Sequence, residues 1–107
     1  MKRLSVAIDG NMQFPTWCRR PSGYVNARVL AAGVAEDTTV PAGATKVLFS
    51  STCNFYAKVG SGSAAVPIDF DNGTASELNP AGWMVDAGDI ISIISPTAGI
   101  VTLSYYA

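Results

Sequence analysis

Short runs of alternating apolar and polar residues fill most of the chain, and clusters of turn residues separate them roughly every 8–12 positions. This spacing is typical of an antiparallel β-sandwich or barrel, and ten glycines and six prolines disfavour long helices. We therefore predict an all-β fold, an antiparallel, jelly-roll-like β-sandwich of about seven or eight strands with a less regular N-terminal segment. The predicted strands are Leu4–Ile8, Tyr24–Leu30, Lys46–Ser51, Phe55–Val59, Trp83–Val85, Asp89–Ser95 and Ile100–Tyr106, with short edge strands at Thr38–Val40 and Val66–Phe70.

The last two predicted strands differ in pattern. In the final strand, Val101, Leu103 and Tyr105 alternate with polar residues, which predicts one face in the core. The strand Asp89–Ser95 carries isoleucines on both faces. That pattern predicts a central strand, or one whose outer face packs on a partner.

Two segments of the chain align with each other at an offset of 45 positions. Residues 40–58 and 85–103 share five identical positions, and each contains a turn, a strand, a short Ser-Thr loop and a strand. We interpret them as two related hairpin units that face each other across the sandwich, although chance similarity between such segments is the alternative. The expected organisation is one domain, with an N-terminal docking segment at 1–35 and a sandwich body at 36–107.

The chain is poor in charge, and the charge that it carries is unevenly distributed. Hydrophobic residues make up 49% and charged residues 14%, below the usual quarter. The first 58 positions hold all seven basic residues and three acids, and the remainder holds five acids. Folding either separates these halves into a positive and a negative end, which would orient binding partners, or interleaves them. A low surface charge favours a subunit packed among neighbours, although a compact β-protein rich in Ala and Gly would look the same.

Composition also bears on the compartment. No window reaches the 18 or so uncharged apolar residues of a membrane span, and the start of the chain lacks the apolar stretch of a signal peptide. We therefore expect assembly in a cytoplasm and no membrane partner. Cys18 and Cys53 fit a reducing compartment, so two free thiols are favoured over a disulfide.

The chemistry of most catalytic sites is missing. The chain has no histidine, which excludes triads and histidine-ligated metals. The acidic run Asp69–Gly73 matches a calcium loop poorly, and Asp86 and Asp89 flank a turn without an evident cleft. Arg19-Arg20 is too short a basic run to indicate nucleic-acid binding. We expect no enzyme activity, no cofactor, no metal and no small-molecule substrate.

The N-terminal segment has the composition of a binding surface. Aromatic residues next to arginines are enriched where proteins bind one another. The alternative is that the aromatic residues cap the core while the arginines are solvated. The candidate partner-binding residues are Lys2, Arg3, Phe14, Trp17, Arg19, Arg20 and Tyr24.

Residues 36–107 resemble small virion proteins of tailed bacteriophages. The phrases that carry the resemblance are Thr39–Thr45, the aromatic strand Asn54–Val59, the turn Ser76–Pro80, and the ending Ile93–Pro96 followed by Leu103–Tyr106. The resemblance implies a capsid decoration or cement protein: a β-sandwich on the outside of the head that bridges capsid subunits. Its implied partners are the major capsid protein and sibling copies in a homo-oligomer, and its implied location is the virion surface.

Two other functions remain open. Within the same class, the chain is an accessory protein of the tail, baseplate or fibre. From a different class, it is a carbohydrate-binding sandwich that stacks sugar rings on Trp17, Trp83 and either Tyr56 or Tyr106.

Overall fold

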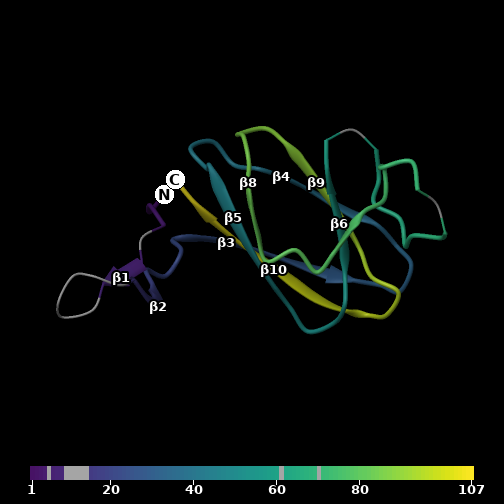
Figure 1. Ribbon diagram of the computed structural model, residues 1–107, viewed down its shortest axis with the longest axis horizontal. Coiled ribbons are helices and arrows are strands. Elements are labelled where there is room, and N and C mark those ends of the chain that lie inside the picture. The colour runs from purple at the N-terminus through teal and green to yellow at the C-terminus, as the bar shows by residue number, and fades with distance from the viewer. Residues whose placement is uncertain (5, 9–14, 61, 70) are drawn as a thin grey trace.

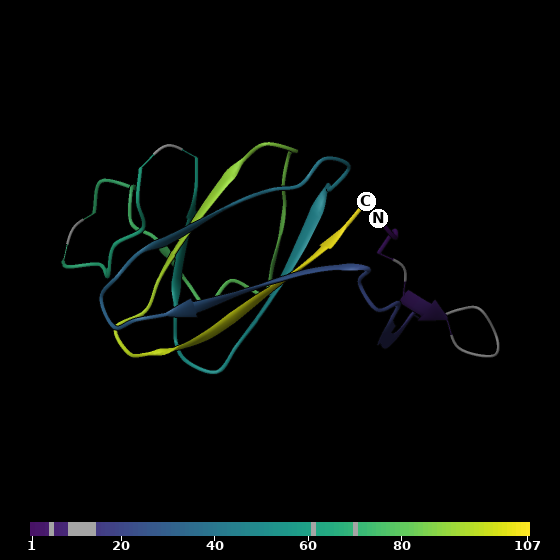
Figure 2. The ribbon, with the colours of Figure 1, turned by 180° about the vertical axis from the view of Figure 1, so that it is seen from behind.

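A computed structural model describes residues 1–4, 6–8, 15–60, 62–69 and 71–107, with the backbone alone considered over 6–8 and 15–19. Two antiparallel sheets of four strands, in the orders β3-β10-β5-β8 and β4-β9-β6-β7, pack face to face, and a separate β1-β2 pair projects from one end (Figures 1 and 2). The predicted all-β antiparallel sandwich is confirmed. The strands are β1 Val6–Ile8, β2 Pro15–Arg19, β3 Tyr24–Leu30, β4 Glu36–Thr39, β5 Lys46–Ser51, β6 Tyr56–Val59, β7 Glu77–Leu78, β8 Gly82–Met84, β9 Ile90–Ile94 and β10 Gly99–Tyr106.

The strand pairs of the sandwich are nested. Strand β3 pairs with β10, β4 with β9, β5 with β8 and β6 with β7, all antiparallel. Two further pairings, β5 with β10 and β6 with β9, join these pairs into the two sheets. The nested order is compatible with a jelly roll, and that finer description of the fold stays a prediction.

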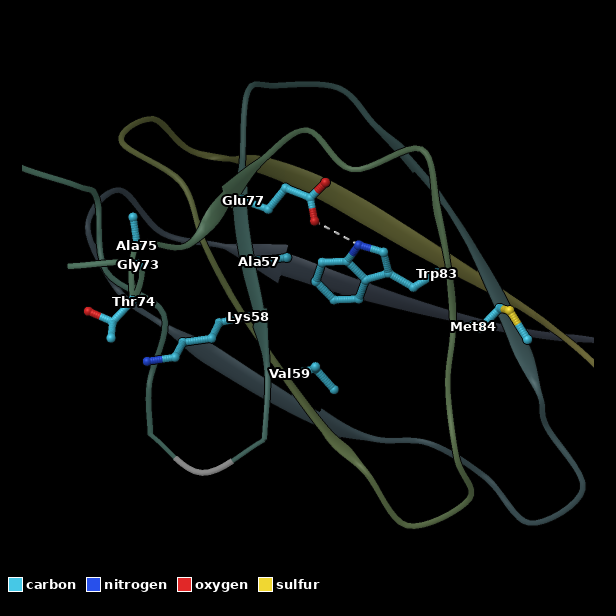
Figure 3. Close-up of a pocket in the computed structure, with 9 residues that line it drawn as sticks. All are labelled: Ala57, Lys58, Val59, Gly73, Thr74, Ala75, Glu77, Trp83 and Met84. Carbon is cyan, nitrogen blue, oxygen red and sulfur yellow. Dashed lines mark hydrogen bonds between the residues drawn. The ribbon is translucent and has the colours of Figure 1, made fainter. Parts of the chain in front are cut away.

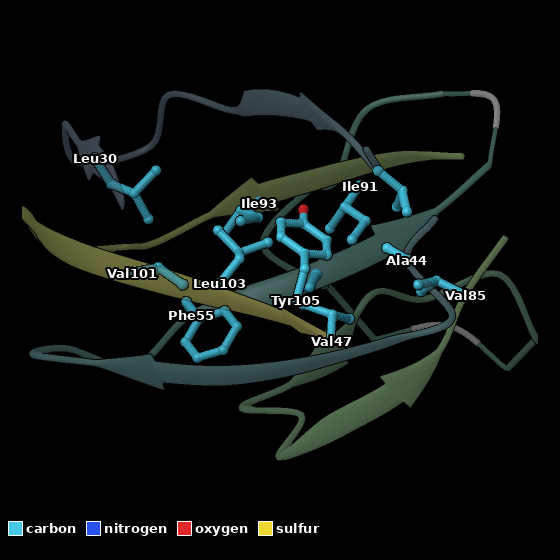
Figure 4. Packing of buried hydrophobic residues seen from close by; sticks show 12 residues of the cluster. Leu30, Ala44, Val47, Phe55, Val85, Ile91, Ile93, Val101, Leu103 and Tyr105 are labelled. Carbon is cyan, nitrogen blue, oxygen red and sulfur yellow. The ribbon is translucent and has the colours of Figure 1, made fainter. Parts of the chain in front are cut away.

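The core lies between the two sheets, and both sheets contribute to it (Figure 4). The alternation of β10 places Val101, Leu103 and Tyr105 in this core, as predicted, and each of these side chains is fully buried. From the other sheet, Ile91 and Ile93 of the central strand β9 meet them. Since β9 lies between β4 and β6, the prediction of a central strand at Asp89–Ser95 is also confirmed.

The two tyrosines at the end of β10 point to opposite faces, and both are buried. The Tyr106 hydroxyl donates a hydrogen bond of 2.6 Å to the carbonyl of Arg20, so the segment before β3 covers this ring. The Tyr105 hydroxyl lies inside the sandwich near Thr38 and makes no well-formed hydrogen bond with the described residues. Burial raises the pKa of Tyr105 above its ordinary value, and Thr38 opposes this shift.

The sequence located most strands well and a few poorly. The predicted bounds of β3 and β5 match the structure. The predicted edge strand at Val66–Phe70 is wrong over 66–69, where Pro67 has no N–H to offer a sheet, and Phe70 lies outside the described residues. Strands β2 and β7 were not predicted.

The expected boundary between a docking segment and the sandwich is also wrong. Strand β3, placed within the docking segment, pairs along its whole length with β10, from Tyr24 opposite Tyr105 to Leu30 opposite Gly99. The sandwich therefore begins at β3. Its inward residue Leu30 belongs to the core, which explains why β3 pairs in the sheet instead of forming part of a loop.

The two repeated segments are not hairpins. In each segment the two strands lie in different sheets: β5 and β6 for residues 40–58, and β9 and β10 for residues 85–103. The segments instead pair with each other, β5 with β10 and β6 with β9. Each segment is therefore a connection from one sheet to the other. A crossing connection satisfies the same turn-and-strand pattern as a hairpin, and only the pairing distinguishes them.

Gly99 begins β10 at a point where no side chain fits. A Cβ added there would lie 2.8 Å from the Cβ of Cys53 and 3.1 Å from the Oγ1 of Thr52, and closer still to the Cys53 sulfur. Contacts this short force neighbouring atoms to move.

We predict that Gly99→Ala lowers the free energy of unfolding by about 1–3 kcal/mol in urea denaturation, because the added methyl overpacks this site. Gly23→Ala is the matched control, since its Cβ would meet nothing nearer than Lys2 Cγ at 3.9 Å. Equal stability of both variants would contradict the close approach at Gly99.

We predict that Tyr105→Phe leaves the free energy of unfolding unchanged or raises it, because the lost hydroxyl has no partner to leave unpaired. Tyr106→Phe should lower it by about 1 kcal/mol through loss of the bond to Arg20. Since the pKa of Tyr105 is raised in the folded chain, wild-type stability should fall as the pH rises above about 10. Tyr105→Phe should reduce that fall, and an unaltered high-pH profile would count against a buried phenol.

Candidate interaction surface

The sheet β3-β10-β5-β8 presents a nearly uncharged outer face to solvent. Register and alternation define the residues that point away from the core. Among the described residues of this face, Lys46 carries the one charge, and its ammonium group lies at the rim against the carbonyl of Ala107. Tyr106 also points to this side but is buried under the segment before β3. The other residues, which we call the neutral face, are Val25, Ala27 and Val29 of β3, Leu48 and Ser50 of β5, Gly82 and Met84 of β8, and Ile100, Thr102 and Ser104 of β10.

Several aliphatic side chains of the neutral face are unusually open to solvent. Met84 is 88% exposed, Val29 73% and Val25 53%. Val29 lies opposite Ile100 in the β3–β10 ladder, so two exposed aliphatic residues sit side by side. Single exposed aliphatic residues are common, but a charge-free sheet face that carries several of them is typical of a surface that another protein covers.

The outer face of the opposite sheet is different. It carries Asp37 on β4 and Lys58 on β6, opposite each other across Ser92 of β9. The chain between β6 and β7 also covers part of this face, because the Ala64 N–H donates to the Ser92 hydroxyl at 2.8 Å and Ser92 is fully buried. The two outer faces are therefore unequal, and the neutral face is the open one.

The structure brings several predicted docking residues together at one end of the sandwich. Lys2 lies beside Gly23, and its carbonyl accepts a 2.8 Å bond from the N–H of Ala107. Arg20 is exposed while its carbonyl holds Tyr106. Tyr24 is 43% exposed and meets Tyr105 edge-to-face, with ring centroids 5.9 Å apart.

The remaining candidates are less fully placed. Arg3 is exposed near the N-terminus. Trp17 and Arg19 belong to β2, where the structure describes the backbone alone. Phe14 lies outside the described residues. The docking role of all seven candidates stays a prediction.

Charge is partly separated along the molecule. Lys2, Arg3 and Arg20 are exposed in the segments that flank the β1-β2 pair, whereas Asp69 and Asp71 are exposed in the segment between β6 and β7. Figure 1 shows the β6–β7 segment at the end of the sandwich opposite the β1-β2 pair. These groups are therefore separated into a positive and a negative end, one of the two arrangements that the sequence left open, and they can orient a partner at long range.

A shallow hollow of about 440 Å³ lies at the open edge of the sandwich, where β7 and β8 end the two sheets (Figure 3). The Trp83 indole forms one wall and stacks edge-to-face on Phe49 at 5.0 Å. Its N–H donates a 2.8 Å hydrogen bond to Glu77, which joins the two sheets across the opening. The hollow is lined by Ala57, Lys58, Val59, Gly73, Thr74, Ala75, Glu77, Trp83 and Met84.

Two of the acidic residues, Asp89 and Glu36, have structural partners. A carboxylate oxygen of Asp89 accepts the backbone N–H of Asp86 at 3.0 Å and closes the turn between β8 and β9. Glu36 forms an ion pair with Arg28 at 3.2 Å. Within the described residues, no group of three or more potential ligands is arranged to hold a metal ion.

The cysteines can be placed in part. Cys53 is a free thiol, partly buried against Gly99. The side chain of Cys18 is not described, so its state stays a prediction.

Comparison of the chain with protein-family models, curated proteins and solved structures found no match. The resemblance to phage virion proteins therefore stays a prediction. In the part of the chain that the structure describes, no helix has the length and hydrophobicity needed to cross a membrane.

The neutral face was not predicted from the sequence. A signal was present: Val25, Ala27 and Val29 alternate with Asn26 and Arg28, and the apolar set faces outward. An isolated alternating strand does not reveal which of its faces is buried. Here the more polar set points inward because β3 lies at the edge of the sandwich, where Arg28 reaches Glu36 of the other sheet.

We predict that Val29→Thr and Met84→Thr each change the free energy of unfolding by less than about 0.5 kcal/mol, because both side chains are exposed. Val101→Thr, on the buried face of the neighbouring strand, should cost about 1–3 kcal/mol by placing a hydroxyl in the core. Urea denaturation measures all three. A large loss in the first two variants would show that the neutral face serves folding and not contact.

Proposed function

We propose that this chain is a non-catalytic structural protein of a tailed-phage virion that decorates the capsid exterior and stabilises the head by bridging subunits. The observation that supports it best is the neutral face, an open β-surface with little charge and several exposed aliphatic residues. Such a surface is costly to leave in water and is suited to packing against other proteins. The neutral face would contact neighbouring subunits or sibling copies.

The positive end supports a second point of attachment. Lys2, Arg3 and Arg20 lie together with Tyr24 at one end of the sandwich, and both described termini meet there through the bond from Ala107 to Lys2. Arginine next to an aromatic ring is a frequent combination in binding hot spots. In this proposal the positive end docks on an acidic part of the capsid, and the sandwich body extends away from it.

The carbohydrate-binding alternative loses part of its support. Tyr106 is fully buried and cannot stack on a sugar. One edge of Trp83 is engaged by Glu77, and its ring packs against Phe49. Tyr56 is partly buried on the outer side of the opposite sheet, away from Trp83. The described aromatic residues therefore form no shared platform, which favours the virion proposal.

We predict that the purified chain co-sediments with phage particles assembled without it, and that Arg19→Glu combined with Arg20→Glu abolishes this attachment by reversing the charge of the docking end. Lys58→Glu is the control, because it reverses a charge on the opposite sheet, away from the docking end. Circular dichroism confirms that each variant is folded.

Three results would contradict the proposal in different ways. Unchanged attachment of the double arginine variant would reject the docking role of the positive end. Attachment to isolated tails and not to heads would favour the tail or baseplate function. Saturable binding to a glycan array by the monomer, without attachment to particles, would favour carbohydrate binding.

A further inference from the structure

The sandwich has four edge strands, and β3 stands apart from the other three. Strands β7 and β8 have two and three residues, and β4 has four, including two acids. Short or charged edges are the usual protection against pairing with another chain. Strand β3 has seven residues, and its single charge, Arg28, is turned back onto β4 by bonds to Glu36 and to the carbonyl of Asp37.

The backbone of β3 leaves one row of groups unused. In β10, the carbonyls of Ile100 and Tyr106 accept hydrogen bonds from the N–H groups of Thr52 and Thr45, which flank β5. The backbone N–H and C=O groups of the even-numbered residues of β10 therefore point to β5, and those of the odd-numbered residues point to β3. The odd-numbered residues of β10 lie opposite the even-numbered residues of β3, so the hydrogen bonds between the two strands use the backbone groups of the even-numbered residues of β3. The N–H and C=O groups of Val25, Ala27 and Val29 point to the free edge, and none of them bonds to another described residue.

This free edge is complementary to itself. An antiparallel pair of β3 strands related by a two-fold axis at Ala27 sets Ala27 opposite Ala27, and Val25 opposite Val29. Each of Val25, Ala27 and Val29 then lies opposite one of the same three residues in the other copy. Because the backbone N–H and C=O groups of these residues point to the free edge, a hydrogen-bonded pair can form at each position. Asn26 falls opposite Arg28, so no like charges oppose each other.

We infer that two copies of this chain pair through β3, edge to edge, and form one continuous eight-stranded sheet. Pairing satisfies the three N–H and three C=O groups of each free edge and brings the exposed Val25 and Val29 side chains of the two copies together on the joined neutral faces. A two-fold arrangement of this kind closes at two copies. The inference does not rest on the proposed capsid function.

The test is the mass of the purified chain by light scattering and sedimentation equilibrium, over a concentration series up to its solubility limit. We expect a monomer–dimer equilibrium. Val25→Lys with Val29→Lys should give a monomer, because each lysine then faces a lysine of the other copy. Val25→Lys with Val29→Glu should restore the dimer, because only the register centred on Ala27 sets residue 25 opposite residue 29 of its partner.

Ala27→Pro provides an independent variant. It removes an N–H that β10 does not use, and proline is tolerated on an edge strand when its missing N–H faces solvent. We expect a folded monomer by circular dichroism, whereas Ala27→Ser, which keeps the N–H, should remain a dimer.

A wild-type chain that stays monomeric throughout the series would overturn the inference. A dimer that survives the double lysine substitution, or a stoichiometry other than two, would overturn it as well. The dimer is measured on the purified chain without phage particles. A monomeric result would therefore not contradict the capsid proposal, and a lack of attachment to particles would not contradict the dimer.

Discussion

The pairing of β10 between β3 and β5 is the constraint on which the rest of the structure depends. It joins the last strand of the sandwich to the first and brings the C-terminal residues to the segment before β3. Because β10 alternates, its inner side chains fill the core, while two of its outer side chains, Thr102 and Ser104 in the middle of the strand, are short and uncharged. One strand therefore fixes both the interior of the sandwich and the centre of the neutral face.

The outer faces of the two sheets differ in their charge and in how far other parts of the chain cover them. The sheet that contains β9 carries charge, and the chain between β6 and β7 covers part of its outer face through the Ala64–Ser92 bond. Among the residues that the structure describes, no comparable segment covers the neutral face of the sheet that contains β10. The same sheet ends in the long unprotected edge of β3. The neutral face and the free edge of β3 therefore lie on the same sheet, so the surfaces available for contact with other proteins are close together.

The sequence predicted most strands and some of their buried faces, but it did not predict which strands pair with each other. Alternation in Ile100–Tyr106 identified the buried set, and turn residues bounded β3 and β5 correctly. Periodicity does not say which strands pair, so the crossing connections were interpreted as hairpins and β3 was assigned to a docking segment. Of the docking residues, Lys2, Arg20 and Tyr24 lie at one end of the sandwich. The neutral face could not be predicted from the sequence, because it depends on the register of four paired strands.

The central claim is that this β-sandwich uses its neutral face and β3 edge as contact surfaces. Electron cryomicroscopy of the chain bound in its native particle tests this claim most directly. We predict that the sheet β3-β10-β5-β8 is covered by protein and that the hollow beside Trp83 faces solvent. A bound chain whose neutral face is bare, with its contacts made instead through the hollow and the segment between β6 and β7, would contradict the account.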